Sequence, residues 1–479
     1  MGGVLHGLVA AMLALGPAPL QAGEEFQDAD QASFDESVVT LDNELAGQTT
    51  FSIATESTTI EWPDPQQPET NTLDFHFENP TEDSIVLNYI GAQHPSHLDG
   101  TIVSNGTTAF SNPFGIFIGE NAVLDVGGLV AIAGDLTRED FLSDQELEIP
   151  LEGAVENLGS IHADSFVGLF GRTVVNQGHV DVGQGVLRIG AGQQLSASRW
   201  DALTSELLGG QDFFGLLGRG GEIRNHGRLG ARDATLMGGR IVNYGEIEIA
   251  DGSLMMLAAD AIYLSEFDDP VLIRLPNDVG TEAVSAPAEG AGGSYAIENH
   301  GRIDAGLGHA RLAASDPLGF GIRQGTGTPE APASISAASI QLEGGETGRV
   351  HLSGEIDASN DARKGVGGEI DVTGSLIVLE DASVEASGNK GGGTIQIGGE
   401  QQGRLEVSEI RFLPIQFVAS SQGSDGRAEA QISLTATIGT TTHRDAFAFR
   451  VYGEDRQGSG EIAMIDPDGL TGKMLAGLG

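Results

Sequence analysis

The sequence predicts an all-β protein built as a parallel β-solenoid, in which the chain winds through stacked coils. Three observations predict this fold: a repeated Asn-x-Gly pattern, alternating apolar residues on both sides of it, and an unusual composition. Of the 479 residues, 71 are glycine, and aromatic residues make up only 5%. Such a composition cannot fill a thick globular interior, but it suits a thin core that is repeated many times.

The repeat reads Val/Ile-x-Asn-x-Gly-x-Ile/Val/Leu-x-Ala/Val/Ile. Apolar residues alternate before and after the Asn-x-Gly step, which predicts short strands joined by a tight bend. Asparagines at the same place in successive coils are expected to stack as a ladder of side-chain amides. The five copies have their asparagines at Asn157, Asn176, Asn225, Asn243 and Asn299. A sixth copy, 350–358, has Leu352 in the asparagine place.

The spacing of these asparagines predicts coils of about 20 residues. The steps from Asn157 to Asn176 and from Asn225 to Asn243 are 19 and 18 residues, and each is interpreted as one coil. The two longer steps, of 49 and 56 residues, are interpreted as two coils plus an inserted loop. The expected insertions are 196–218, with helical spacing at Trp200, Leu203 and Leu207 after a Ser198 cap, and 266–296, a Pro- and Gly-rich loop.

Charge limits the partners of this chain. It carries 69 Asp and Glu against 24 Lys and Arg, and no Lys or Arg precedes Arg138. Nucleic acid is therefore excluded as a partner, because binding phosphates requires clustered cations. The chain has no cysteine, so its stability must come from backbone pairing and stacked side chains rather than from disulfides.

Residues 1–22 are expected to be a secretory signal peptide. Their apolar stretch from about Gly7 to Leu15 is too short to span a bilayer, and Ala22 is a plausible cleavage position, although no Lys or Arg precedes the stretch.

The segment from about Thr59 to Ala133 resembles the amino-terminal secretion domain of filamentous-haemagglutinin-like proteins, the exported members of two-partner secretion pairs. "TTIEW" at 58–62 is similar to an early strand of that domain. Three boxes then follow in the family's order: Gly100–Gly106, the "NPNGI"-like Asn112–Ile116, and "VGGLVA" at Val126–Ala131. Two positions depart from the family pattern, Phe114 in place of an asparagine and His94 where an asparagine often precedes Pro-Ser.

The resemblance implies a right-handed parallel β-helix that passes unfolded through a dedicated outer-membrane β-barrel transporter. It implies a protein that is secreted by a Gram-negative bacterium, or kept at its outer-membrane surface, and that acts in adhesion. The expected partners are that transporter and a glycan or surface ligand on a host or neighbouring cell. The residues expected to serve transporter recognition are Asn105, Gly106, Asn112, Pro113, Gly115, Ile116, Gly127 and Gly128.

The resulting domain plan has six parts. They are 1–22, the signal peptide; 23–150, the secretion domain; 151–265, β-helix coils with the 196–218 insertion; 266–296, a loop; 297–403, further coils; and 404–479, final coils or a cap.

No catalytic, metal-binding or cofactor-binding site is expected. His94 and His97 flank Pro-Ser and are assigned to a surface loop, and His226 and His300 to equivalent solvent-facing turns. The acidic stretches 266–270 and 357–361 have the residue types of a calcium site, but such stretches are common in so acidic a chain. We predict no catalytic residue, no metal and no cofactor. The alternatives are a polysaccharide-acting β-helical enzyme, and a truncated cytolysin or contact-inhibition protein.

Overall fold

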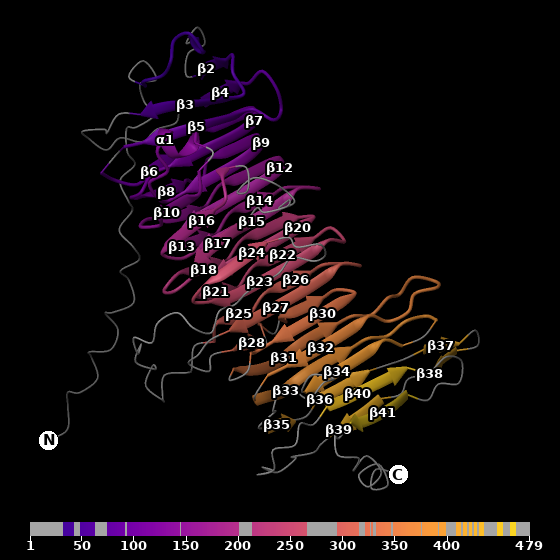
Figure 1. The fold of residues 1–479 in the computed structure, drawn as a ribbon. Helices are drawn as coiled ribbons and strands as arrows, with labels where there is room; N and C mark the ends of the chain where they lie inside the picture. Colours follow the sequence, from indigo (N-terminus) through magenta and orange to yellow (C-terminus); the bar gives the residue numbers. More distant parts are fainter. Residues whose placement is uncertain are drawn as a thin grey trace, which may run out of the picture.

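In the computed structural model, the chain forms one long stack of parallel β-coils (Figure 1). The structure describes residues 32–42, 48–62, 74–143 except 92, 145–200, 213–265, 295–315 and 321–398 with short gaps at 326, 329–331, 346–347, 375 and 391. Beyond these it describes only the backbone of the strands from 409 to 465. The expected signal peptide and most of the 266–296 loop lie outside the described residues.

Each coil contributes a strand to three parallel faces. Face 1 is built from β3 (Ser57–Trp62), β5 (Ile85–Ile90), the second parts of β7 (Thr101–Ser111), β9 (Val123–Ile132) and β12 (Ser160–Gly171), then β15 (Val186–Ala191), β20 (Asp233–Gly238), β23 (Ser253–Ala259), β27 (His309–Ser315), β30 (Ser339–Glu343), β32 (Glu369–Thr373) and β34 (Thr394–Gly398).

Face 2 follows the same order along the stack. It is built from β2 (Gln48–Ile53), β4 (Asp74–Glu78), the first parts of β7, β9 and β12, then β14 (His179–Asp181), β19 (Arg228–Ala231), β22 (Glu246–Ile249), β26 (Arg302–Asp304), β29 (Ser334–Ser336), and the last parts of β31 (Arg349–Asp357) and β33 (Leu376–Glu385).

Face 3 carries the residues that precede each Asn-x-Gly turn. It is built from β6 (Ser96–Leu98), β8 (Gly115–Ile118), β11 (Ala154–Asn157), β13 (Thr173–Asn176), β18 (Glu222–Asn225), β21 (Arg240–Asn243), β25 (Ile297–Asn299), β28 (Ile322–Gln324) and the first parts of β31 and β33. The predicted parallel β-helix is thereby confirmed.

The core inside the three faces changes in character along the stack. Its first coils are filled by aromatic rings, and Phe51 contacts both Trp62 and Phe77 at centroid distances of 5.9 and 5.2 Å. Beyond them the core is almost wholly Ile, Leu, Val and Ala. The first coil is closed by β1 (Val39–Asp42), which pairs antiparallel with β2 and covers an edge that would otherwise be free to pair with another chain.

A second, antiparallel sheet covers the outside of face 1. Its strands, in spatial order, are β10 (Leu147–Pro150), β16 (Gln194–Ala197), β17 (Phe213–Leu217) and β24 (Ile262–Ser265). The two sheets enclose a second apolar core. Arg188 is buried within it between the rings of Phe166 and Phe214, at 5.7 and 5.9 Å from their centroids, and this burial lowers the pKa of Arg188 to about 10.

This second sheet changes the interpretation of the 196–218 insertion. β16 overlaps its start and β17 lies at its end, so both ends of the insertion are strands. Trp200, where helical spacing was expected, is helical. Trp200 is buried against Phe141, with ring centroids 5.1 Å apart, whereas Leu203 and Leu207 lie outside the described residues. Phe141 belongs to the short helix α1 (Arg138–Phe141), which begins with a Thr137 capping box. Within the described residues no helix is long and apolar enough to span a bilayer.

The C-terminal part ends the stack with a change of strand direction. β35 (Glu409–Phe412) and β36 (Ile415–Val418) continue the parallel stack on β33. β39 (Gln431–Leu434) then pairs antiparallel with β36, and β40 (Ala448–Gly453) pairs antiparallel with both β34 and β41 (Gly460–Ile465). The remaining strands, β37 (Ser421–Gly423) and β38 (Gly426–Ala428), form a hairpin.

Candidate functional site

The turn at Asn112 is held by its own side chain. Asn112 is fully buried, and its Nδ2 donates to the carbonyl oxygen of His94 at 3.0 Å and to Ser96 Oγ at 2.8 Å. Its Oδ1 accepts a hydrogen bond from the backbone N–H of Phe114 at 2.9 Å. One amide therefore closes the turn and fastens it to the preceding coil.

Gly115 and Ile116 continue this turn into β8. Gly115 has φ +126°, a backbone conformation that favours glycine. A Cβ there would lie 2.9 Å from the carbonyl oxygen of Ala154 in the next coil. Ile116 is 1% exposed and faces the core. By contrast Phe114, at the tip of the turn, is 50% exposed.

Asn105 and Gly106 form the corner between the two halves of β7. The Asn105 side chain pairs with the backbone of Asn79, accepting from its N–H at 2.7 Å and donating to its carbonyl at 2.9 Å. A Cβ on Gly106 would lie 2.6 Å from the carbonyl oxygen of Ser84. The corner is therefore bonded to the coil before it and leaves no room for a side chain at Gly106.

Gly127 and Gly128 form the matching corner of the next coil. A Cβ on Gly127 would lie 2.9 Å from the carbonyl oxygen of Asn105, and one on Gly128 would lie 2.6 Å from Thr107 Oγ1. The Gly127 carbonyl accepts a hydrogen bond from Ser165 Oγ at 2.7 Å. The glycine pair thus permits close approach of the coils on both sides.

The structure therefore groups the eight expected recognition residues into two places. Asn105, Gly106, Gly127 and Gly128 lie together at the stacked corner between faces 1 and 2, and the residues from Asn112 to Ile116 form the turn that enters face 3. Gly106, Asn112, Gly115, Ile116 and Gly128 are buried in the folded coil. Their side chains and backbones shape the fold and offer little surface to a partner.

The five repeat asparagines form a continuous hydrogen-bonded ladder inside face 3. The Nδ2 of each donates to the Oδ1 of the next at 2.8 Å, in the order Asn157, Asn176, Asn225, Asn243, Asn299. All five are at most 2% exposed. Because their amides pair with one another, the polar column is compatible with its apolar surroundings.

The ladder corrects the interpretation of the long steps. Asn176 bonds directly to Asn225, and Asn243 directly to Asn299, so each long step is one coil with a large insertion, not two coils with a small one. A sixth amide, Gln324, accepts from Asn299 Nδ2 at 2.9 Å and was not expected from the sequence, since its turn has no Asn-x-Gly. Leu352 follows Gln324 in register, and the Nε2 of Gln324 has no hydrogen-bond partner.

The histidines divide into two kinds. His226 and His300 occupy the middle place of Asn-x-Gly, as expected, and sandwich the ring of Tyr244 at 4.9 and 5.1 Å. His97 was assigned to a surface loop, and this is wrong: it lies in β6, is 4% exposed and packs on Phe117. Burial lowers the pKa of His97, although Asp99 raises it.

The acidic stretch at 357–361 serves the turn in which it lies. Asp357 Oδ1 accepts from the backbone N–H of Ser359 at 2.8 Å, and Asn360 Oδ1 accepts from that of Ala362 at 3.1 Å. Among the described residues no three His, Asp or Glu side chains come together in the manner of a metal site. The stretch 266–270 lies outside the described residues.

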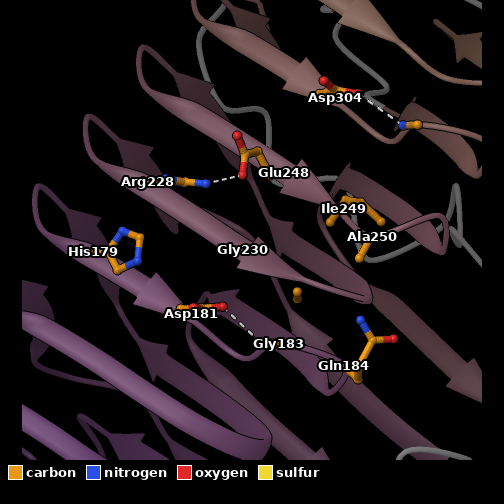
Figure 2. Close-up of a pocket in the computed structure, with 12 residues that line it drawn as sticks. His179, Asp181, Gly183, Gln184, Arg228, Gly230, Glu248, Ile249, Ala250 and Asp304 are labelled. Carbon is orange, nitrogen blue, oxygen red and sulfur yellow. Dashed lines mark hydrogen bonds and ion pairs between the residues drawn. The ribbon is translucent and has the colours of Figure 1, made fainter.

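A polar hollow on the outside of face 2 was not foreseen from the sequence. Figure 2 shows it between Asp181, Gly230 and Glu248 on three successive coils, with Gln184 and Ala250 at its edge. Its volume is about 430 Å³. Sequence reasoning missed it because it depends on which corners come to stack on one another.

Comparison with known proteins identifies the secretion domain. Residues 74–256 match the family model "TPS secretion domain". The crystal structure of the HMW1 secretion domain from Haemophilus influenzae has a similar fold, with a TM-score of 0.50 and 19% sequence identity over 76% of this chain and 92% of that one. The match continues past the expected boundary at residue 150.

Two curated relatives match shorter parts of the chain. A heme/hemopexin-binding protein of Haemophilus influenzae strain Rd is 25% identical over 193 residues, covering 36% of this chain and 21% of the relative. A second protein of that name from Haemophilus influenzae is 27% identical over 100 residues, which cover 21% of this chain and 11% of the relative. The matched segments span about a fifth or less of the curated relatives.

The ordered turns at Asn105, Asn112 and Gly127 all lie within the matched segment of the parallel β-helix. Residues 74–256 therefore form a TPS secretion domain, the domain that the exported proteins of two-partner secretion carry.

Proposed function

We propose that the chain is exported through a dedicated outer-membrane β-barrel transporter, which recognises residues 59–133 before they fold. The observation that carries this proposal is the burial of Gly106, Asn112, Gly115 and Ile116 in the finished coils. A partner that reads these residues must meet them in an extended chain, because the folded coil covers them.

Strand addition is the recognition mode that we propose. An extended segment adds to a free sheet edge of the transporter through its backbone, and alternate side chains supply specificity. β7 and β9 provide long alternating segments for this purpose, since Ile102, Leu124 and Val126 are buried at every second position. The turn residues between them would set the register in which the segment pairs.

Folding outside the cell then makes export directional. The first coils carry the aromatic cluster around Phe51 and Trp62 and are closed at one edge by β1. Once they form, their free edge is a template for the next coil, as in other repeat folds whose units contact only their neighbours. Each coil that folds removes unfolded chain from the exit and so biases movement outwards.

The broad test is deletion of residues 59–133 from the full chain in a cell that makes the transporter. We expect the deleted chain to be retained in the periplasm, measured as the ratio of extracellular to cell-associated protein. Undiminished export would overturn the proposal.

A sharper test compares two turns that both contain a buried, hydrogen-bonded asparagine. The variant Asn112→Ala/Pro113→Ala changes the proposed recognition turn, and Asn243→Ala/Tyr244→Ala changes a ladder turn farther along the stack. We expect the first variant to reduce secretion severalfold more than the second. Unfolding of both refolded proteins is measured as a control, and equal secretion defects would mean that the turn at Asn112 is only structural.

We further propose that the exported chain acts in adhesion, either released or kept at the outer-membrane surface, by binding a ligand on a host or neighbouring cell. The curated relatives named for heme/hemopexin binding support a binding role rather than a catalytic one. Purified protein is expected to bind cells saturably. Release of unsaturated sugars from polyuronates, seen as ultraviolet absorbance, would favour the enzymatic alternative instead.

A further inference from the structure

The hollow on face 2 is produced by a corner that is shorter than the corners on either side of it. Asp181 pairs with Gly230, and Val186 pairs with Asp233. The corner 182–185 therefore stacks on the shorter corner 231–232, which is followed in turn by the longer corner 249–252. The short corner is recessed, and its longer neighbours form two walls, which carry Gln184 and Ala250 in Figure 2.

Gly230 makes this hollow deeper because it has no side chain. The surrounding backbone would leave room for a side chain at this position. Its neighbours Leu229 and Ala231 are buried in the core, so position 230 faces outwards. A Cβ at Gly230 would meet nothing closer than Asp181 Oδ1 at 3.6 Å, an ordinary contact, whereas a Cβ at Gly227 would lie 1.9 Å from the carbonyl oxygen of Gly178. A glycine inside a strand weakens it, and it often marks a bulge, a bend, or a place where a ligand or another backbone approaches closely. No backbone atom comes closer than an ordinary contact to a Cβ at Gly230, which favours a ligand.

The groups around the hollow are held in place before any ligand arrives. Asp181 Oδ1 accepts from the backbone N–H of Gly183 at 3.0 Å, and Asp304 Oδ1 from that of Gly306 at 3.1 Å. Arg228 donates to Glu248, and this hydrogen bond and the charge of Glu248 raise the pKa of Arg228. Rigid polar groups of this kind bind with less loss of conformational freedom than mobile ones.

Charge in the hollow favours a neutral ligand. Arg302 donates to Glu246 at 2.7 Å and to Asp304 at 2.5 Å, so together with Arg228 it compensates the carboxylates on one wall. An anionic ligand is disfavoured because the protein carries a net charge of −45. The carboxylates still have free lone pairs that accept hydrogen bonds, and Arg228 and the Gln184 amide offer donors.

Hydroxyl groups suit these partners because each can both donate and accept. The exposed Ala250 adds a small apolar surface, which matches the C–H surface of a sugar ring. The volume of about 430 Å³ lies within the ~300–1,000 Å³ of small-molecule sites. Asp181 and Glu248 are two coils apart, or roughly 9.6 Å at the usual strand spacing, so both ends of the hollow carry an acceptor.

From this geometry we propose that the hollow at Gly230 binds a neutral saccharide, with Asp181, Glu248 and Asp304 as acceptors and Arg228 and Gln184 as donors. This names the ligand class for the adhesive role proposed above and rests on that role for its biological purpose. Most of the site lies within the secretion domain and Asp304 lies beyond it. The site does not depend on how the chain is exported.

The test uses the purified full chain, a printed array of neutral oligosaccharides, and calorimetric titration with the oligosaccharide that binds best. Gly230→Val fills the hollow with a side chain that suits a strand, so we expect at least tenfold weaker binding with no loss of thermal stability. Ser336→Val is the matched control, because Ser336 follows Asp304 on the same outward row but lies outside the hollow. It should bind as the unchanged protein does.

A second variant, Gln184→Leu, removes one donor at an exposed corner where folding is not at risk, and should also weaken binding. The proposal is overturned if no oligosaccharide binds, if Gly230→Val binds normally, or if only a tetralysine peptide binds, which would make the hollow a site for basic peptides. Adherence to cells is measured in parallel. Saccharide binding without adherence supports the site and counts against the adhesive role alone.

Discussion

The coils that carry Asn157 to Gln324 and the coils that carry Leu352 and Leu379 turn the chain between faces 3 and 2 in different ways. In the first group, which we call the ladder coils, a buried side-chain amide lies at the turn and bonds to the amide of a neighbouring coil. In the second group, the later coils, the same row is occupied by leucine.

In the coil of Leu352, backbone geometry takes the place of the amide. β31 runs continuously through the turn, with a register shift between Leu352 and Gly354, and Gly354 has φ +72°. Ser353 Oγ donates to the carbonyl oxygen of Gln324 at 2.7 Å, which satisfies one group at the end of the ladder. The same bend can therefore be fixed by a polar column or by one glycine in a left-handed conformation.

The ladder links coils whose strands are far apart in the sequence. Asn176 and Asn225 are 49 residues apart, and Asn243 and Asn299 are 56 apart, yet each pair is in direct contact. A column of matching amides specifies which strand must stack on which, because a shifted pairing would leave buried amides unpaired. The later coils carry no insertions of this size within the described residues, and leucine is sufficient there.

The largest effect is expected for Asn225→Ala, in the middle of the ladder. The change removes the donor to Asn243 Oδ1. It also removes the 2.8 Å acceptor of Asn176 Nδ2, which keeps only the carbonyl oxygens of Gly178 and Arg228 at 3.3 Å. We expect a loss of about 2–4 kcal/mol in the free energy of unfolding, measured by denaturant titration.

Gln177→Ala is the control for this prediction, since Gln177 is exposed in a neighbouring turn. It should change stability by no more than about 0.5 kcal/mol. A loss for Asn225→Ala as small as that of the control would show that the ladder contributes only to strand register and not to stability.

The sequence predicts those features of the structure that are encoded by a few neighbouring residues. The Asn-x-Gly ladder and the alternation around it were readable because each is confined to a few residues with a fixed period. Gln324 was missed because glutamine provides the same amide without the Asn-x-Gly signature. The size of the insertions was misjudged because their strands, such as β16 and β17, belong to a second sheet that has no repeat of its own.

Features that join residues far apart in the sequence could not be predicted, because no local pattern marks them. The second core joins residues as distant in sequence as Leu87 and Leu264, and no periodic pattern connects them. The hollow at Gly230 depends on a short corner coming to stack between two longer ones. By contrast, the turns at Asn112 and Gly127 were located correctly, since a proline and a glycine pair mark them directly in the sequence.

An intermediate effect is expected where the ladder meets the later coils. Leu352→Asn and Leu379→Asn both place an amide in a buried leucine position. Only the first finds a partner, because Gln324 Nε2 is buried there without a hydrogen bond. We expect Leu379→Asn to destabilise the protein by about 2–4 kcal/mol and Leu352→Asn by about 1–2 kcal/mol less, by thermal or denaturant unfolding. Equal losses would mean that the ladder cannot be extended by one coil.

The smallest effect concerns a second column, on the outside of the ladder coils. Tyr244 is 50% exposed, and its ring stacks between His226 and His300 with interplanar angles of 11° and 12°. The column ends at Gly325, where a Cβ would lie 2.4 Å from His300 Nδ1. The exposed rings thus follow the buried amides coil by coil and end at the same place.

Tyr244→Ala is expected to cost about 0.5–1.5 kcal/mol, since stacked rings contribute that much beyond their buried area. A double-mutant cycle with His226→Ala separates the stacking energy from the loss of contact with the backbone. A coupling energy near zero would mean that the rings do not stabilise one another. Their stacking would then only follow from the stacking of the asparagines beneath them. A coupling of about 0.5 kcal/mol or more would make the outer column a second determinant of coil order, acting on the same turns as the ladder.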